Sequence, residues 1–326
     1  MHNIGKILVP VVLVFGFTGP IAAAPRVAAT AVNEANFSEL KPKQISPAAI
    51  KAQVLLDRAG FSPGVIDGHW GENAQKAAKV FQRGKGLPET GRLDRGTWDK
   101  LTASASEPVL VDYEISRNDV KGPFVKKLPQ KLEQQAELKR LSYTSPAEAL
   151  AEKFHMDVDL LRALNPGKDF KKAGERIAVA AVPQESRQQK VARVVVSKRD
   201  GAVSALADDG TLIAYFPATV GSDEKPAPSG MTEVRTIAEN PNYTYNPDYK
   251  FKGVKSKEKF EIQPGPNNPV GVVWIGLSVD GYGIHGTPEP ATVSKTASNG
   301  CVRLTNWDAR ALARMVSKGT PVEFVE

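Results

Sequence analysis

Apolar positions follow two different patterns along the 326-residue chain. Up to about residue 183 many of them recur at spacings of three and four, the period of a helix that buries one face. After residue 190 they fall into short runs broken by Asp-Gly and Pro- or Gly-rich turns, which is typical of strands and hairpins. The pattern predicts a multidomain α+β chain with helical units first and a mostly β domain last.

The first helical region covers residues 46–102 and predicts a small three-helix domain. Ser46 and Pro47 are a cap and a first helical residue, and this helix ends at Gly60. Two further helices are expected at Asn73–Arg83 and Arg95–Leu101. We interpret residues 25–45, which are alanine-rich and polar, as a flexible linker.

A second region, residues 139–183, predicts a β-α-α-β unit. Ser145 with Pro146 starts one helix, and Asp157 or its neighbour starts another that runs through Leu164. Residues 103–138 begin with a strand-like alternation and continue as a polar, charged stretch. We interpret them as a second linker.

Residues 191–326 predict a mostly β domain with one late helix. Asp200-Gly201 and Asp209-Gly210 are hairpin signals, and residues 271–277 and 281–285 are short apolar strands. Thr305 or Asn306 is expected to cap a helix that reaches about Ser317. A final strand, VEFV, is expected to complete the sheet.

Residues 1–24 have the pattern of a secretory signal peptide: Lys6, an apolar run from Ile7 to Phe17, and then GPIAAA. Cleavage after Ala23 or near Ala28 and an uncleaved anchor are both open. The apolar run is short for a membrane span, so we expect export to the periplasm with no stable span after cleavage. The net charge of +7 comes from basic residues spread along the chain. No basic stripe interleaved with aromatic residues supports a nucleic-acid partner.

The candidate chemistry lies in residues 284–304, IHGTPEPATVSKTASNGCVRL, which hold the only cysteine. A single cysteine in an oxidising compartment has no internal disulfide partner. Cys301 needs an activating neighbour to act as a nucleophile, and His285 is a suitable base. Gly300 allows a turn in which backbone N–H groups converge on an oxyanion, and Arg303 offers a cation for a carboxylate.

These residues carry a resemblance to a known family. The HGT of residues 285–287 and the SNGCVR of residues 298–303 resemble the signature of L,D-transpeptidase (YkuD-like) catalytic domains. The matching positions are His285, Gly286, Thr287, Ser298, Gly300, Cys301 and Arg303. NPNYTYNP (residues 240–247) and PGPNNPVG (residues 264–271) are also similar to segments of that family.

The two earlier regions also carry resemblances. LLDRAGF, DGHWG, AAKVFQ and GLPETGRLD, within residues 46–102, resemble a peptidoglycan-binding domain. Residues 149–167 and 173–179 are similar to a LysM domain. Thr144, Ser145 and Pro146 stand where LysM carries Gly-Asp-Thr. Because that loop helps to hold glycan in the family, a glycan-binding module and a structural spacer both remain open.

The resemblance implies acyl transfer on peptidoglycan without metal or cofactor. Cys301 would attack a tetrapeptide stem and expel its terminal D-alanine, with His285 as base and backbone amides at Gly300 and Cys301 holding the oxyanion. The resemblance assigns substrate binding to Arg303, Ser298, Gly286, Thr287, Asn299 and Tyr282. Such enzymes are also acylated by carbapenems.

Several alternatives stay open from the sequence. The thioester can be resolved by a neighbouring stem, which gives a 3-3 cross-link, by water (an L,D-carboxypeptidase), by a free D-amino acid or by an envelope protein. From other classes, a non-catalytic adaptor that binds glycan strands and a cysteine hydrolase of unrelated peptides are both considered. The intact histidine, glycine and cysteine set argues against the adaptor.

Overall fold

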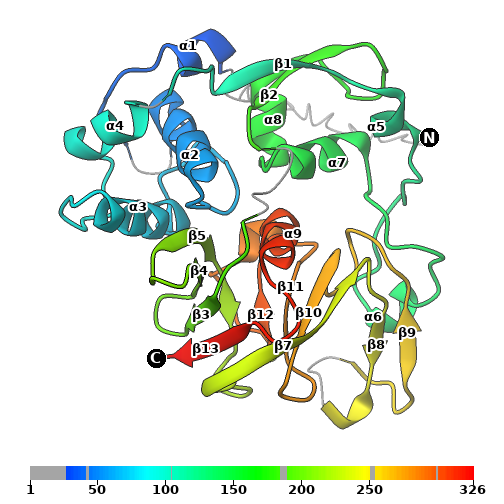
Figure 1. The fold of residues 1–326 in the computed structure, drawn as a ribbon. Helices are drawn as coiled ribbons and strands as arrows, with labels where there is room; N and C mark the ends of the chain where they lie inside the picture. Colours follow the sequence, from blue (N-terminus) through cyan, green and yellow to red (C-terminus); the bar gives the residue numbers. More distant parts are fainter. Residues whose placement is uncertain (1–26, 42–43, 104, 184–188, 250–253, 299) are drawn as a thin grey trace, which may run out of the picture.

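The computed structural model describes residues 27–41, 44–103, 105–183, 189–249, 254–298 and 300–326. The predicted signal peptide, residues 1–24, lies outside the described residues. Three units follow one another along the chain: the helical unit (residues 27–103), the central unit (residues 110–121 and 141–183) and the sheet unit (residues 191–326). The helical and central units lie side by side on one side of the sheet unit (Figure 1).

The helical unit contains α1 (Ala29–Asn33), α2 (Pro47–Ala59), α3 (Glu72–Gly84) and α4 (Arg95–Thr102). Ser46 caps α2 as predicted, since its side chain accepts a hydrogen bond from the N–H of Ala49. Gly60 ends α2 with φ of 89°, a left-handed conformation that favours glycine. The apolar faces of α2, α3 and α4 form the buried interior of this unit.

The central unit contains β1 (Leu110–Glu114), α5 (Arg117–Lys121), α7 (Pro146–Lys153), α8 (Val158–Leu164) and β2 (Arg176–Ala180). β1 and β2 form an antiparallel pair in which Asp112 is opposite Ala178. Ser145 and Asp157 cap α7 and α8, as the sequence predicts. Between α5 and α7 the chain runs down beside the sheet unit, forms α6 (Leu132–Gln135) next to β9 and returns (Figure 1).

The sheet unit contains most of the strands. They are β3 (Arg193–Ser197), β4 (Ala202–Leu206), β5 (Leu212–Pro217), β6 (Thr219–Val220), β7 (Gly230–Glu239), β8 (Tyr243–Tyr245), β9 (Phe260–Ile262), β10 (Val273–Leu277), β11 (Gly283–His285), β12 (Val302–Arg303) and β13 (Pro321–Val325). Its helices are the single-turn η1 (Pro247–Tyr249) and η2 (Pro290–Thr292) and the longer α9 (Asn306–Met315).

Within the described residues, nine of these strands form one sheet in the order β5-β4-β3-β13-β7-β10-β11-β12-β6. The pairs β13–β3 and β11–β12 are parallel, and the other neighbours are antiparallel. β8 and β9 form a separate hairpin. The late helix α9 is capped by Thr305, and its buried face packs on β10 and β11. The sequence-based fold class is therefore confirmed for the helical unit and for the mostly β unit with its late helix.

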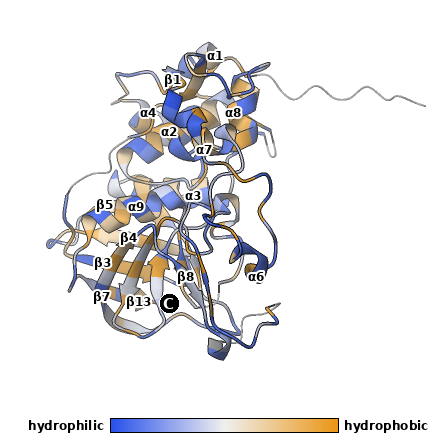
Figure 2. Cartoon of the chain, turned by 90° about the vertical axis from the view of Figure 1, so that its right-hand side faces the viewer, coloured by the Kyte–Doolittle hydropathy of each residue, from blue (hydrophilic) through white to orange (hydrophobic). Residues whose placement is uncertain are grey.

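The helical unit is attached to the edge of the sheet by backbone hydrogen bonds. The N–H of Ser62 donates to the carbonyl of Tyr215 at 2.9 Å, and the N–H of Tyr215 donates to Gly60 at 2.9 Å. This pairing covers the free edge of β5. In the hydropathy view, α3 and α9 lie between the helical layer and the sheet (Figure 2). The three units therefore form one packed assembly.

Within the described residues, each of the two segments interpreted as linkers contains packed structure, and the strand-like alternation at the start of the second segment forms a strand. In the first, Val32 of α1 is fully buried, and the side chain of Asn33 exchanges hydrogen bonds with the backbone of Leu110. In the second, residues 110–114 form β1, the first strand of the central unit, so this unit does not begin at residue 139. The partner strand lies over sixty residues away in sequence, and local pattern does not reveal such a pairing.

Among the described residues, no helix combines the length and the apolar character that crossing a membrane requires.

Candidate functional site

The candidate site lies where β11 and β12 run side by side. Their parallel register places Ile284 opposite Val302 and His285 opposite Arg303. Cys301 immediately precedes β12 and lies two residues before Arg303. In an extended chain this spacing puts two side chains on the same side. The register places His285 beside Arg303, and the charge of Arg303 acts on the ionisation of both His285 and Cys301, so the three side chains lie near one another.

His285 is held in a buried position with one ring nitrogen occupied. Only 6% of the residue is exposed. Its Nδ1 lies 2.6 Å from the carbonyl oxygen of Gly286, which can only accept, so Nδ1 carries the proton and donates. The other nitrogen, Nε2, is then left as the proton acceptor of the neutral ring.

The pKa of His285 is lowered to about 4, chiefly by burial and also by the positive charge of Arg303, against the opposing effect of the Gly286 hydrogen bond. The imidazole is therefore neutral at pH 7. An uncharged imidazole can accept a proton from a thiol, so this state suits a general base.

The thiol of Cys301 is partly buried, with Sγ 3.7 Å from the carbonyl oxygen of Gly281. Burial raises its pKa, while a hydrogen bond with the Gly283 backbone and the charge of Arg303 lower it. The thiol is therefore protonated at neutral pH, and the free protein holds a neutral pair rather than a thiolate–imidazolium pair. The proton must move from sulfur to nitrogen as the thiol reacts.

Gly300 has a conformation that requires glycine. Its φ is +93°, and a Cβ atom there would lie 2.8 Å from Cε1 of Tyr282. The hydroxyl of Tyr282 in turn donates to the carbonyl of Pro226 at 3.5 Å. The ring of Tyr282 therefore packs against the backbone just before Cys301. Asn299 lies outside the described residues.

Ser298 fixes the backbone on the other side of the cysteine. Its hydroxyl donates to the carbonyl oxygen of Cys301 at 2.6 Å, and its N–H donates to Gly221 at 3.0 Å. Thr287 is buried, and its hydroxyl accepts from the N–H of Glu289 at 3.2 Å. Both side chains are engaged in local backbone hydrogen bonds.

Arg303 is the cation of the site. Its pKa is lowered by burial and raised by the nearby charges of Glu289 and Cys301. Nη1 lies 3.5 Å from the hydroxyl of Thr296, at the limit of a hydrogen bond. The guanidinium therefore lies close enough to the thiol to influence its ionisation.

Three residues beside the candidate site are not among the site residues that the sequence predicted. Trp274 of β10 is opposite His285 and stacks on its ring, with centroids 5.6 Å apart. Tyr243 of β8 lies near enough to Cys301 for the charge of the thiol to raise its pKa, in addition to burial. Asn306 is fully buried behind Gly286. The alternation of Trp-x-Gly in β10 and Gly-x-His in β11 was the signal in the sequence that could have pointed to Trp274. Tertiary packing brings Tyr243 and Asn306 to the site.

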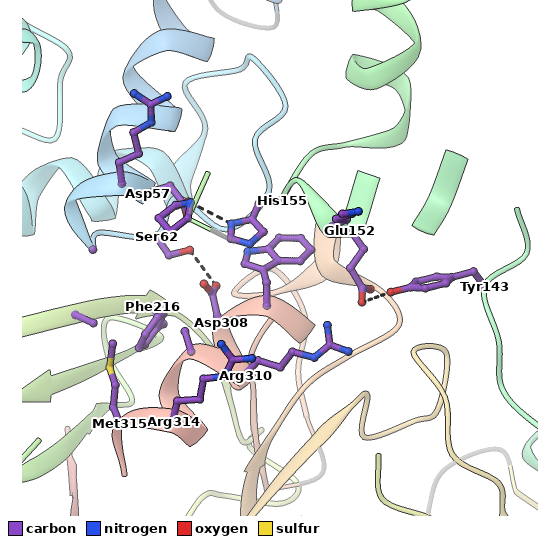
Figure 3. A pocket seen from close by; sticks show the side chains of 17 residues that line it. Asp57, Ser62, Tyr143, Glu152, His155, Phe216, Asp308, Arg310, Arg314 and Met315 are labelled. Carbon is purple, nitrogen blue, oxygen red and sulfur yellow. Dashed lines mark hydrogen bonds and ion pairs between the residues drawn. The ribbon is translucent and has the colours of Figure 1, made fainter. Parts of the chain in front are cut away.

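A separate cavity of about 250 Å³ lies where the three units meet (Figure 3). It is lined by residues of α2, α7 and α9 and of neighbouring segments, among them Asp57, Glu152, His155, Asp308 and Arg310. Neither Cys301 nor His285 lines it. It is therefore a feature of the junction between units and distinct from the candidate site. Among the described residues, no group of three or more His, Cys, Asp or Glu side chains is arranged to hold a metal ion.

Comparison with known proteins places the chain in a family. Residues 191–324 match the model of the L,D-transpeptidase catalytic domain, and residues 46–101 match that of the putative peptidoglycan binding domain. The chain is 34% identical to a putative L,D-transpeptidase of Bacillus subtilis, YqjB, over 135 residues, which are 40% of this chain and 68% of that protein. The chain belongs to the L,D-transpeptidase family.

Two further matches describe the extent of the similarity. The putative L,D-transpeptidase YkuD of Bacillus licheniformis is 47% identical over 62 residues, which are 19% of this chain and 38% of that protein. The chain thus spans well under two thirds of this relative's length. The catalytic domain of the E. faecium L,D-transpeptidase is similar at 20% identity, with 42% of this chain and 98% of that domain covered and a TM-score of 0.33.

Proposed function

We propose that this protein is a peptidoglycan L,D-transpeptidase that acts through a thioester on Cys301. The observation that supports the proposal is that His285, paired with Arg303 by the register of β11 and β12 and neutral with Nδ1 donating to Gly286, shares the influence of the Arg303 charge with the thiol of Cys301. Membership of the L,D-transpeptidase family supports the substrate class. No metal or cofactor takes part in the proposed chemistry.

The first half-reaction forms the thioester. The Sγ of Cys301 attacks the carbonyl carbon of the third residue of a tetrapeptide stem, and its proton passes to Nε2 of His285. Backbone N–H groups at Gly300 and Cys301 stabilise the oxyanion of the tetrahedral intermediate. The intermediate then collapses, the bond to the terminal D-alanine breaks, and His285 returns the proton to the departing amine.

The second half-reaction transfers the acyl group to an acceptor. An amine of a neighbouring stem attacks the thioester, loses a proton to His285 and expels the sulfur, which leaves a cross-link between two third residues. In this scheme Arg303 binds a carboxylate of the stem, and Tyr282, Thr287 and the Gly286 backbone line the site. Asn299, which lies outside the described residues, is kept as a proposed substrate-binding residue. Ser298 keeps the Cys301 backbone in place through its 2.6 Å hydrogen bond.

The N-terminal units fit a wall-associated enzyme. The helical unit, with its match to a peptidoglycan-binding domain, holds glycan strands, and the central unit is a LysM-like module that also serves as a spacer. Residues 1–24 act as a signal for export, so the protein works in the periplasm at the cell wall. Carbapenems are expected to acylate Cys301 in the same way as the stem does.

The decisive experiment is mass spectrometry of the products from disaccharide-tetrapeptide of a diaminopimelate-type wall. A dimer with the summed mass of two substrates minus one free alanine establishes the transpeptidase. A tripeptide monomer alone establishes an L,D-carboxypeptidase, and products with added D-amino acid or with an envelope protein identify those acceptors.

The variant Cys301→Ala separates the enzyme from an adaptor. It is expected to make no product and to acquire no carbapenem mass, while it still sediments with wall sacculi because the helical unit is intact. If wild-type protein sediments with sacculi but gives no product with any acceptor, the protein is an adaptor and the proposed chemistry is wrong.

A further inference from the structure

A chain of hydrogen bonds joins the central unit to the backbone that orients His285. It starts at Glu152 in α7, whose carboxylate accepts from the hydroxyl of Tyr143 at 2.7 Å (Figure 3) and from Nδ2 of Asn306 at 2.9 Å. Glu152 belongs to the central unit, and Asn306 is the first residue of α9 in the sheet unit. The contact therefore crosses from one unit to the other.

The amide of Asn306 is fixed at every polar atom. Nδ2 donates to Glu152 and also to the carbonyl of Pro266 at 3.0 Å, so both of its hydrogens are used. Oδ1 accepts from the N–H of Val272 at 3.2 Å. Since the side chain is fully buried, a reversed amide would leave several of these groups without partners.

Asn306 also lies wedged between two glycines. A Cβ atom added at Gly271 would come within 2.1 Å of its Oδ1, and one added at Gly286 within 2.2 Å. No side chain fits at either position while the amide stays in place. The side chain of Asn306 thus determines where the backbone of Gly286 lies.

The carbonyl oxygen of Gly286 accepts the hydrogen bond from Nδ1 of His285 at 2.6 Å, and the N–H of Gly286 donates to the carbonyl of Val273 at 3.2 Å. A shift of the Gly286 peptide would move this carbonyl and turn the imidazole away from Cys301. A displacement of about 1 Å in a reacting group is enough to slow catalysis by orders of magnitude.

From these contacts we infer that Glu152 and Asn306 are positioning residues for His285, so that the central unit completes the catalytic site from behind. The inference rests on the proposed function for the chemistry that His285 performs. The sheet unit alone lacks Glu152, and one hydrogen of the buried Asn306 amide would then have no partner. The central unit thereby acquires a role in catalysis that does not depend on glycan binding.

The test compares Glu152→Ala with Glu148→Ala in the full chain. Glu148 is one turn earlier on α7 and also reaches the sheet unit, where Oε1 accepts from Nδ2 of Asn267 at 2.8 Å. Each variant loses one hydrogen bond across the same junction. Within the described residues, however, no hydrogen bond joins Asn267 to Gly286, so Glu148→Ala should leave the backbone beside His285 in place. The measured quantities are the thermal unfolding midpoint, kcat and KM for the stem, and the rate of Cys301 alkylation by iodoacetamide as a function of pH.

We expect Glu152→Ala to lower kcat and the alkylation rate at pH 7 by about tenfold, with KM changed by less than about twofold. Glu148→Ala should keep both rates within about twofold of wild type even if its unfolding midpoint falls equally. Equal rates in the two variants would overturn the inference. If wild type makes no product at all, the proposed function fails, and the alkylation profile still decides this inference.

A second pair of variants covers the case in which Glu152→Ala does not fold. Asn306→Asp puts a carboxylate against Glu152 and should reduce the alkylation rate. Adding Glu152→Gln supplies an amide donor toward the new carboxylate. The double variant should be alkylated at least about three times faster than Asn306→Asp. A double variant no faster than Asn306→Asp would contradict the role of this contact.

Discussion

The imidazole of His285 lies nearly parallel to the indole of Trp274, with ring centroids 5.6 Å apart and an angle of 19° between the planes. The two residues are opposite each other in β11 and β10. The indole occupies space that two glycines leave open: a Cβ atom at Gly283 would lie 2.6 Å from Cζ2 of Trp274, and one at Gly276 would lie 3.0 Å from Nε1. Glycine at these two positions therefore allows the indole of Trp274 to pack against the imidazole of His285.

Gly283→Ala is predicted to push the indole out of place and release His285. We expect a loss of about 1–3 kcal/mol in the free energy of unfolding, as for other overpacked sites, and at least about a tenfold fall in kcat. Urea unfolding and steady-state kinetics measure the two effects.

The control for this prediction is Gly84→Ala, where an added Cβ meets nothing within 4 Å. It should leave both kcat and stability close to wild type. Trp274→Phe in the Gly283→Ala background shortens the ring and should recover part of the lost stability. Unchanged kinetics in Gly283→Ala would show that the stacking does not position the base.

The pH dependence of thiol reactivity follows from the pKa of His285, which burial lowers to about 4. The imidazole must be neutral to accept the thiol proton, so the rate should fall only as pH drops through about 4 and not near its ordinary value of about 6.5. The measurement is kcat/KM from pH 3 to pH 9, with circular dichroism to confirm that the protein stays folded. An acidic limb centred near pH 6.5 would contradict a buried neutral base.

Ser298→Ala is predicted to loosen the backbone at Cys301. The variant removes a 2.6 Å hydrogen bond to the partly buried carbonyl of Cys301, which still accepts from the N–H of Gly221 at 3.4 Å, and should cost about 0.5–1.5 kcal/mol in the free energy of unfolding. The rate of carbapenem acylation, followed by intact mass, should fall with it. Ser197→Ala, which removes an exposed hydroxyl bonded to Asp200, is the matched control and should change neither quantity. Acylation at the wild-type rate would limit Ser298 to a structural role.

Asp308 predicts a second pH effect, on stability. Burial and the charge of Asp57 raise its pKa to about 7, against the opposing effects of His155 and of hydrogen bonds with Thr305 and Ser62. Its ordinary value is about 3.9, so the folded protein holds this proton more tightly than the unfolded chain. The contribution of Asp308 to stability is therefore present at low pH and is lost as pH rises toward 7, by roughly 3 kcal/mol between pH 4 and pH 7.

The readout for this effect is the difference in unfolding free energy between wild type and Asp308→Asn. It should move in favour of the variant as pH rises from 4 to 7, because the amide does not titrate. Ser62→Ala removes the hydrogen bond to Asp308 but keeps the carboxyl, so its difference from wild type should depend much less on pH. A pH-independent difference for Asp308→Asn would contradict the raised pKa.

Much of the local structure was readable from single residues. Ser46, Ser145, Asp157 and Thr305 each cap the helix that the sequence assigned to them, because a short polar side chain that satisfies free N–H groups is a local signal. The motif around Cys301 likewise singled out a candidate nucleophile and a candidate base, and the glycine that it predicted to form a turn has a positive φ of 93°. The roles of these residues in catalysis stay predictions until the variants are measured.

Other features depended on contacts between residues distant in sequence. The strand at residues 110–114 pairs with residues 176–180, and the segment around Val32 is ordered by packing on neighbouring units. Trp274, Tyr243 and Asn306 reach the site from three separate segments. Tyr243 lies in the NPNYTYNP segment and Trp274 in a Trp-x-Gly alternation, but neither pattern says which side chain faces the site, so only their neighbours in space distinguish them.

The sequence by itself determined which residues are candidates for the chemistry, because a thiol, an imidazole and a glycine are properties of individual residues and of their spacing. The tertiary structure decided how these residues are held: the protonation state of His285, the tautomer fixed by Gly286 and the link through Asn306 to Glu152. Burial and hydrogen bonding depend on which surfaces meet after the chain has folded. A local pattern of residues therefore does not encode them.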